Sequence, residues 1–358
     1  MSDVVISGYY GFRNNGDDAL LMSIIQGLKA EKPDITITVL SKNPEETRRI
    51  YGINAVSRQN VFKIAAELWR ARLLISGGGT LMQDRTSTKS LLYYLSIIRA
   101  ALCMNKKVML YANGIGPLSS AKNRERARRV LSRVDVITLR DRASYDELMK
   151  IGVTGPKIEL TADPAFGIMP AGEPVRQDRP RICVSVRPWK GARADFADIL
   201  ARVCDYANEK YGVETAFLPM QPQRDTEITE KIRSKMKSPS ALIKPDYDAP
   251  RLLSRLAGYE MCIGMRLHTL IYAACVCVPV VGLVYDPKVS GFLDYIGSDN
   301  YCSVETLGEA DLCAAVDRCF ANRNEAVKRL RENREWLREA AMKNAKTAVG
   351  LLGEAGGR

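Results

Sequence analysis

The chain has 358 residues, about twice the length of a typical domain, so we expect two domains with ample cores. Its 46% hydrophobic and 26% charged residues are those of a soluble globular protein, and its longest apolar run, residues 270–285, is too short to cross a bilayer. The net charge of +12 indicates an anionic partner, and because no zinc finger or RNA-recognition signature is present, nucleic acid is disfavoured relative to phosphates and membrane lipid.

The cysteines and the histidine content bear on metal binding and on the compartment. Nine cysteines are scattered without a C-x-x-C pair, and His268 is the only histidine. A zinc site is therefore disfavoured, and buried thiols in a reducing cytosol are the better explanation. The N-terminus runs directly into a strand pattern without a secretory signal. We predict a cytoplasmic protein with no bound metal.

The first motif follows the first predicted strand and reads GYYGFRNNGDDAL, residues 8–20. Its glycines permit a tight turn into a helix, but their spacing is not that of a dinucleotide-binding loop. Asn14, Asn15 and the carboxylates of Asp17 and Asp18 suit hydrogen bonds to sugar hydroxyls, or a general base. Each aspartate could equally serve only as a helix cap.

Further along the first half, strands again end in glycines. The run LLISGGGTLMQD ends a strand in three glycines, 77–79, which indicates that a ligand or another backbone comes close, with a flexible turn as the weaker alternative. Thr80, Gln83 and Asp84 would line the same rim, and Arg140 ends a later strand. The alternation of strands and helices through residues 1–168 favours a parallel doubly wound sheet. Helices are predicted at residues 44–51, 60–70 and 87–104.

The second half repeats the α/β pattern after a linker. Residues 169–180 are rich in proline, glycine and charge, and we assign them to the linker. The second domain covers residues 181–323, with Arg187 at the end of its first strand. Residues 324–358 form a basic amphipathic helix that could pack back on the first domain, with a membrane-surface role as the secondary alternative. Its apolar stripe comprises Val327, Leu330, Trp336 and Leu337.

Residues 259–289 carry the strongest signal and read as strand, helix, strand. Ligands collect beyond the carboxyl ends of parallel strands, so Arg266 and His268 after the first strand should meet Lys288 after the second. Backbone N–H groups of residues 265–267 at the helix start would favour an anion. Each side chain alone is more often a surface or structural residue, but together they predict a site for a small, highly charged anion.

Taken together, these motifs resemble the polysaccharide pyruvyltransferase family over residues 4–295. Within that family the chain looks most like the bacterial enzymes that modify cell-wall polymers for anchoring of S-layer proteins. The resemblance implies two Rossmann-like doubly wound domains facing a cleft, as in GT-B glycosyltransferases. The motifs are GYYGFRNNGDDAL, LLISGGGTLMQD, YANGIGP, LRDRASYDELMKIG, TADPAFG, VSVRP, IGMRLHTLIYA and VPVVGLVYDPKVSGF.

The family resemblance also implies a reaction. A pyruvyl group passes from phosphoenolpyruvate to two hydroxyls of one sugar, giving a cyclic ketal and phosphate without a cofactor. The acceptor would be a disaccharide on a lipid diphosphate, with N-acetylmannosamine as the expected sugar, at the cytoplasmic leaflet. The residues expected to bind phosphoenolpyruvate are Arg266, Leu267, His268 and Lys288. Either Arg140 or Arg187 would complete this group of cations, the anion clamp. Acceptor binding falls on Tyr10, Asn14, Asp17, Gly78, Gly79 and Asp84.

The chemistry of the donor suits these residues, because phosphoenolpyruvate carries a carboxylate and a phosphate that several cations can hold. We expect His268 to protonate the methylene carbon and Asp17 or Asp18 to accept the hydroxyl proton. Two alternatives stay open. One is a GT-B nucleotide-sugar glycosyltransferase, with Asp246 or Asp286 on the ribose; the other is a noncatalytic basic adaptor at a membrane surface. The sequence predicts no oligomeric state.

Overall fold

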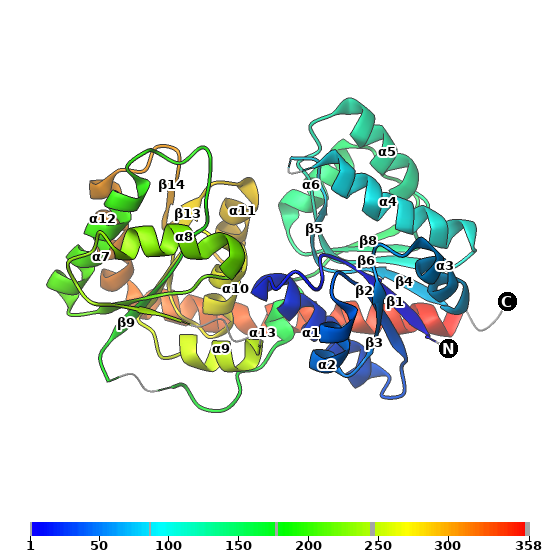
Figure 1. The fold of residues 1–358 in the computed structure, drawn as a ribbon, viewed down its shortest axis with the longest axis horizontal. Coiled ribbons are helices and arrows are strands. Elements are labelled where there is room, and N and C mark those ends of the chain that lie inside the picture. The colour runs from blue at the N-terminus through cyan, green and yellow to red at the C-terminus, as the bar shows by residue number, and fades with distance from the viewer. Residues whose placement is uncertain (1, 86, 176–177, 244–247, 355–358) are drawn as a thin grey trace. The chain divides into compact units, whose positions relative to one another are not determined.

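The computed structural model describes residues 2–85, 87–175, 178–243 and 248–354, and the chain divides into two compact units (Figure 1). Unit 1 comprises Met1–Arg13, Asp17–Gly167 and Leu337–Arg358, and unit 2 comprises Asn14–Gly16 and Ile168–Trp336. The boundary after Gly167 therefore falls beside the start of the predicted linker. The long helix α13 (Arg323–Glu354) begins in unit 2 and ends in unit 1.

Unit 1 is built on a parallel sheet of eight strands, in the order β3-β2-β1-β4-β6-β7-β8, with β5 paired to β6. Most of its central strands are continuous apolar runs that are buried along their length, as expected for a sheet covered on both faces. The strands are β1 (Val4–Ser7), β2 (Ile37–Ser41), β3 (Asn54–Ser57), β4 (Leu73–Ser76), β5 (Gly79–Met82), β6 (Lys107–Ile115), β7 (Val136–Leu139) and β8 (Lys157–Leu160).

Helices cover both faces of this sheet (Figure 1). One core joins the sheet to α3, α4, α5 and α6, and the other joins it to α1 and to Ala348 and Leu351 of α13. Asn344 of α13 bonds to Thr161, at 3.0 Å between Oδ1 and Oγ1. The helices of unit 1 are α1 (Asn15–Glu31), α2 (Pro44–Tyr51), α3 (Val61–Arg70), α4 (Thr88–Cys103), α5 (Ala121–Leu131) and α6 (Arg142–Lys150), followed by the short 3₁₀ helix Pro164–Gly167.

Unit 2 repeats the architecture with a six-stranded parallel sheet in the order β11-β10-β9-β12-β13-β14. Its strands are β9 (Arg181–Ser185), β10 (Glu214–Phe217), β11 (Ser240–Leu242), β12 (Met261–Gly264), β13 (Val280–Val284) and β14 (Tyr301–Ser303). Its helices besides α13 are α7 (Phe196–Tyr211), α8 (Pro222–Arg233), α9 (Ala249–Leu256), α10 (Leu267–Cys275), α11 (Pro287–Tyr295) and α12 (Glu309–Ala321).

Each sheet reverses its strand order about its first strand. In unit 1, β1 lies between β2 and β4; in unit 2, β9 lies between β10 and β12. Ligands of open α/β sheets bind beyond the carboxyl ends of the strands at such a reversal. In unit 1 this place is flanked by the loops that follow β1 and β4, and in unit 2 by the loops that follow β9 and β12. These are the loops that carry the sequence motifs.

Helix boundaries followed from local signals where a capping residue was present. Asn60 and Ser87 accept N–H groups in the first turns of α3 and α4, which begin within one residue of the predicted positions. Strands were harder to predict. The short β3, β5 and β14 were missed, and the triple glycine is not simply a strand end because β5 resumes at Gly79. Across the described residues, the structure holds no helix with the length and apolar character needed to span a membrane.

The apolar stripe predicted on the C-terminal helix packs mainly on the protein itself. Leu330 and Leu337 are buried, and the Trp336 ring lies edge-on against Tyr295, with 5.3 Å between the ring centroids. Leu330 and Leu337 are therefore not available to a membrane, whereas Trp336 and Met342 stay 41% and 46% exposed. A membrane-surface role of this helix stays the secondary alternative.

Candidate functional site

Four side chains predicted to meet an anion lie at one edge of the unit 2 sheet. Arg187 follows β9, Arg266 and His268 follow β12, and Lys288 follows β13. These three strands are neighbours in the sheet, with β12 between the other two. The sequence order of the motifs thus becomes spatial order at the carboxyl edge of a single sheet.

Arg266 is already paired with a carboxylate. Its Nε lies 3.0 Å from Oδ2 of Asp225 in α8, and its Nη2 bonds to Oδ1 of the same carboxylate. Asp225 is 0% exposed and also accepts the N–H of Gln221 at 2.9 Å. The pair fixes the β12–α10 turn and leaves Nη1 as the part of the guanidinium that a ligand can engage. Arg266 therefore brings less free positive charge to a ligand than the sequence predicted.

We predicted that the backbone N–H groups of residues 265–267 would all face an anion at the start of a helix, and the structure corrects this. α10 begins at Leu267, two residues later than expected, with Arg266 as its N-cap. The N–H of Met265 donates to the carbonyl oxygen of Ser185 at 2.8 Å, within the β9–β12 junction. Met265 is thus part of the sheet's hydrogen bonding and is not available to an anion.

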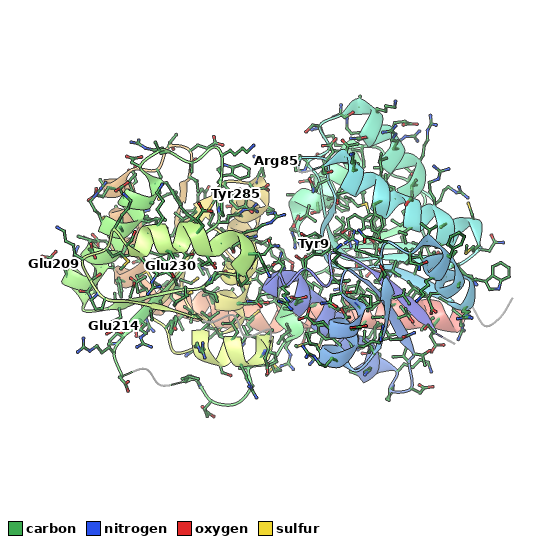
Figure 2. All side chains as sticks on the ribbon, viewed as in Figure 1. Tyr9, Arg85, Glu209, Glu214, Glu230 and Tyr285 are labelled. Carbon is green, nitrogen blue, oxygen red and sulfur yellow. The ribbon has the colours of Figure 1, made fainter. Side chains whose placement is uncertain are left out.

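Tyr285 gathers the other two cations of this edge around its ring. Its hydroxyl accepts a hydrogen bond from Nη1 of Arg187 at 3.3 Å, and its ring centroid lies 5.2 Å from Cζ of Arg187 and 5.6 Å from Nζ of Lys288. Trp189 packs at a tilt against the same ring, 4.9 Å between centroids. Figure 2 labels Tyr285, which directly follows β13.

At Tyr285 the effect of the two cations exceeds that of the neighbouring carboxylate of Asp286. Burial acts to raise the pKa of its phenol, but Lys288 and then Arg187 outweigh burial and leave the pKa below its ordinary value. Among the described residues, Arg187 and Lys288 form no ion pair through their side chains, and the nearby carboxylate of Asp286 accepts the backbone N–H of Lys288. Two cations held beside an aromatic ring, neither of them in an ion pair among the described residues, are the best anion site that this edge offers.

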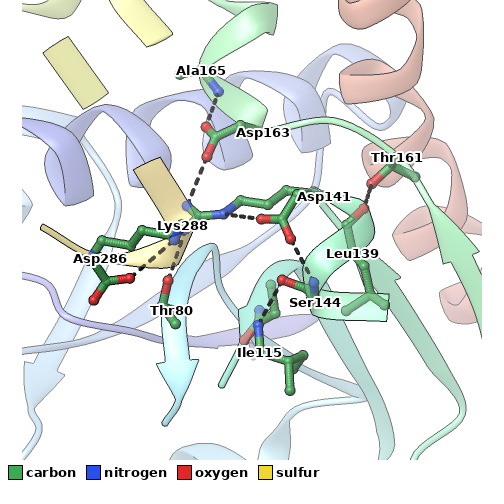
Figure 3. Close-up of polar contacts among 12 residues, drawn as sticks. Thr80, Ile115, Leu139, Asp141, Ser144, Thr161, Asp163, Ala165, Asp286 and Lys288 are labelled. Atoms are coloured by element: carbon green, nitrogen blue, oxygen red, sulfur yellow. Dashed lines mark hydrogen bonds and ion pairs between the residues drawn. The ribbon is translucent and has the colours of Figure 1, made fainter. Parts of the chain in front are cut away.

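Arg140, unlike Arg187, is already paired with carboxylates. Figure 3 labels its partners Thr80, Asp141 and Asp163. It follows β7 and bonds through Nη1 to Asp163 at 3.0 Å and through Nη2 to the hydroxyl of Thr80 at 2.8 Å. Its Nε lies 3.4 Å from Asp141, and the side chain is 4% exposed. Burial would lower the pKa of Arg140, but the two carboxylates outweigh it and raise the pKa. Arg140 thus ties β5 to the segments that follow β7 and β8, and the geometry favours Arg187 for the anion clamp.

His268 packs against the backbone of the first motif. The tripeptide Asn14–Gly16 belongs to unit 2, where Tyr272 donates a hydrogen bond to the carbonyl of Asn15 at 2.7 Å. The N–H of Asn15 donates to the carbonyl of Met220 at 3.0 Å. A methyl group on Gly16 would lie 2.2 Å from Nδ1 of His268, so only glycine fits beside the imidazole. The sequence indicated a turn glycine, and its tertiary role is to admit His268.

The two aspartates of the first motif lie within the first turn of α1, beyond its cap position. Asn14 holds that position, and its side chain accepts an N–H there, from Gly16 at 3.2 Å. Asp18 is buried, and burial followed by the charges of Asp17 and Glu46 raises its pKa to about 8. A carboxyl with such a pKa is mostly protonated at neutral pH, which makes Asp18 a weaker base than its position suggested.

This pKa predicts how stability depends on pH. The pKa of Asp18 is raised from 3.8 to about 8 in the folded protein, so its contribution is fully present below about pH 4 and is lost as the pH rises towards 8. Between these pH values the free energy of unfolding of wild type should fall by up to about 1.4 kcal/mol per pH unit relative to that of Asp18→Asn. Urea unfolding of both proteins across this range measures the difference. A constant gap between the two proteins would contradict the raised pKa.

The triple glycine and Tyr10 serve packing. A methyl group on Gly77 would lie 2.1 Å from the Tyr10 hydroxyl, and one on Gly78 would lie 3.3 Å from Leu20 of α1. Gly79 has a φ of +97°, which disfavours other residues. Tyr10 is 0% exposed beneath these turns. The close approach predicted at the glycines is therefore made by side chains of unit 1, and Tyr10 has a packing role there. Its contact with the acceptor stays a prediction.

Asp84 also has a structural role. Its carboxylate accepts the N–H groups of Ser119 and Ser120 at 2.8 and 3.1 Å and the amide of Asn123 at 2.9 Å. Burial acts against ionisation, but these hydrogen bonds outweigh it and lower the pKa of Asp84. These hydrogen bonds anchor the start of α5, and the contact of Asp84 with the acceptor stays a prediction. Asn14, Asp17, Gly78 and Gly79 stay as predictions.

Three residues of the unit 2 site were missed in the sequence. Tyr285 could have been found from its place directly after an apolar strand, beside the Asp-Pro-Lys motif. Asp225 and Trp189 carry no local signal, because only the fold brings them to the strand ends. Of the ribose-binding candidates of the alternative reaction, Asp286 caps α11 by accepting the N–H of Lys288 at 3.1 Å. Asp246 lies outside the described residues, as do residues 176–177 of the predicted linker.

The chain resembles known proteins both in sequence and in fold. In sequence, it is 22% identical over 388 aligned positions, 90% of this chain and 93% of the relative, to the amylovoran biosynthesis protein AmsJ of Erwinia amylovora. In fold, a putative UDP-N-acetylglucosamine 2-epimerase of Listeria monocytogenes gives a TM-score of 0.71 at 11% identity, covering 99% of this chain and 97% of the other.

The rhamnosyltransferase SpnG of spinosyn biosynthesis gives a TM-score of 0.58 at 13% identity, covering 97% of this chain and 99% of the other. Both solved structures establish the fold, which is of the GT-B type with two Rossmann-like sheets, as predicted. The sequence also matches the family model for polysaccharide pyruvyl transferase over residues 14–287, which include the Arg-Leu-His motif and almost all of the Tyr-Asp-Pro-Lys motif. The chain belongs to the polysaccharide pyruvyl transferase family.

Proposed function

We propose that this protein transfers a pyruvyl group from phosphoenolpyruvate to two hydroxyls of one sugar, releasing phosphate and closing a pyruvate ketal. Family membership supports pyruvyl transfer to a polysaccharide. The observation that carries the donor assignment is the pair of cations around Tyr285, Arg187 and Lys288, neither of which forms an ion pair among the described residues. A ligand with a phosphate and a carboxylate supplies the missing negative charge.

The proposed chemistry assigns one role to each side chain. His268 donates a proton to the methylene carbon of the donor, which leaves a cationic centre at C2. The first sugar hydroxyl attacks C2 and gives up its proton, and phosphate then leaves with the electrons of its bond to C2. The second hydroxyl attacks C2, loses its proton to the deprotonated His268 and closes the ring. Arg187, Lys288 and Nη1 of Arg266 hold the anionic groups, with the backbone of Leu267 beside them. Because Asp18 is protonated near neutral pH, Asp17 is the better candidate for the base.

The acceptor is the less constrained partner. The relative from Erwinia amylovora is described as an amylovoran biosynthesis protein, which supports an acceptor within a cell-surface polysaccharide. Our finer proposal is a disaccharide on a lipid diphosphate carrying N-acetylmannosamine, in a pathway for anchoring S-layer proteins. The basic net charge of +12 suits a diphosphate acceptor at the cytoplasmic leaflet.

Phosphate release from phosphoenolpyruvate in the presence of a saccharide acceptor tests the donor assignment. We expect Lys288→Met to raise the KM for phosphoenolpyruvate by roughly 10- to 100-fold, because it removes one charge-assisted contact. Tyr285→Phe should have a smaller effect, since it removes only the hydroxyl that bonds to Arg187. The matched control is Lys190→Met, in which an exposed lysine of the loop after β9 is lost.

An unchanged KM in Lys288→Met would contradict the placement of the donor beside Tyr285. Release of UDP from a UDP-sugar, with no phosphate from phosphoenolpyruvate, would contradict the reaction itself. It would instead favour the nucleotide-sugar transferase that shares this fold.

A further inference from the structure

Helix α3 presents large apolar side chains to solvent. Its inner face is formed by Ile64 and Leu68, which are buried in the core of unit 1. Its outer face carries Phe62 and Trp69, which are 89% and 71% exposed and lie two turns apart on the same side of the helix. Val61 beside them is 72% exposed. Phe62 is the most exposed of the large apolar side chains in the described chain, so this surface needs an explanation.

The neighbouring helix α4 extends this surface with positive charge. α3 and α4 lie side by side on one face of the unit 1 sheet (Figure 1). Exposed residues of α4 recur every three or four positions at Lys89, Leu92, Ser96, Arg99 and Cys103, so they form one outward stripe, with Thr88 also exposed at the start of the helix. Lys106, just beyond α4, donates a hydrogen bond to the carbonyl of Trp69 at 2.7 Å and joins the two helix ends. We call this surface the α3–α4 face.

The charge on the α3–α4 face is strongly one-sided. Lys63, Arg70, Lys89 and Arg99 are all exposed. Glu67 is the only acidic residue in either helix, and it lies 3.5 Å from Arg70. An aromatic pair flanked by lysine and arginine matches the boundary of a bilayer, where the rings enter the headgroup layer and the cations meet anionic lipid. Protein interfaces, in contrast, are depleted in lysine.

We propose that the α3–α4 face binds the surface of an anionic phospholipid membrane. Phe62, Trp69 and Val61 enter the headgroup region, and Lys63, Lys89 and Arg99 contact lipid phosphates around them. The protein would therefore be held at the membrane by unit 1, through α3 and α4, and not by the C-terminal helix. Binding through this face does not depend on the reaction proposed above.

Sedimentation with vesicles tests the α3–α4 face directly. Wild type should bind vesicles of phosphatidylcholine containing phosphatidylglycerol, and should bind pure phosphatidylcholine more weakly. The double variant Phe62→Ser/Trp69→Ser should lower binding to the anionic vesicles at least about tenfold, because it removes the two inserting rings. Both side chains are exposed, so the thermal unfolding of the variant should match wild type.

Two further variants separate the contributions. Lys89→Glu/Arg99→Glu should abolish the preference for phosphatidylglycerol, because it reverses the charge of the α4 stripe. Trp336→Ser, which removes a 41% exposed tryptophan of α13, should bind as wild type does. Normal binding by Phe62→Ser/Trp69→Ser together with loss of binding by Trp336→Ser would move the membrane contact to the C-terminal helix and overturn the proposal.

Two other outcomes would also overturn it. One is failure of wild type to sediment with the anionic vesicles. The other is self-association in solution that disappears in Phe62→Ser/Trp69→Ser while vesicle binding is unchanged, which would identify the α3–α4 face as a contact between two copies of the chain.

Discussion

Replacing Arg266 by alanine is expected to destabilise the protein by about 3–5 kcal/mol, because the change leaves a buried carboxylate without its counter-charge. Asp225 is fully buried and receives two bonds from this guanidinium, whose own side chain is 11% exposed. The free energy of unfolding in urea measures the loss. Activity of the variant has to be compared under conditions where it is folded, since unfolding alone would reduce donor use.

The structure offers matched controls for this prediction. Arg70→Ala removes a surface arginine that is 3.5 Å from Glu67, and it should cost less than about 1 kcal/mol because such exposed pairs contribute little. The double variant Arg266→Met/Asp225→Leu removes both buried charges and should be more stable than Arg266→Ala alone. Equal losses in Arg266→Ala and Arg70→Ala would show that the buried pair is not important for stability.

Replacing His268 by glutamine is expected to lower turnover by roughly 10²- to 10⁴-fold at saturating phosphoenolpyruvate, because the proposed proton donor is lost. Stability should change little by comparison, since glutamine occupies similar space. Phosphate release per enzyme measures turnover, and urea unfolding checks the fold. A variant with near-normal turnover would exclude His268 as the general acid.

A steric variant tests the same side chain without altering its chemistry. In Gly16→Ala the new methyl group would overlap Nδ1 and Cγ of the imidazole, at 2.2 and 2.5 Å, so His268 must move. Turnover should fall although every proposed catalytic group is retained. Gly350→Ala in α13 is the control, because no atom lies within 4 Å of the added methyl group and alanine favours a helix. Equal activity in both variants would mean that the position of the imidazole is unimportant.

Much of the fold could be predicted from local pattern. Continuous apolar runs such as Val4–Ser7 and Val280–Val284 mark strands buried on both faces, and capping residues such as Asn60 set the helix starts. Parallel strands place the residues that follow them at one edge, so the order of strands and motifs along the chain was enough to assign Arg187, Arg266 and Lys288 to a common edge. The order of the motifs along the chain also predicted the family, which the family model confirms.

The sequence alone therefore determined the α/β class, the edge of each sheet where the motifs lie and the family, because these depend on short-range periodicity and on strand order. Only the tertiary structure decided which charged residues are already satisfied. Arg140 and Arg266 have buried carboxylate partners 23 and 41 positions away in the chain, Arg187 has none among the described residues, and Gly16 lies against His268. The charge that a side chain can offer to a ligand depends on such distant partners, and their approach is fixed by packing of the whole unit.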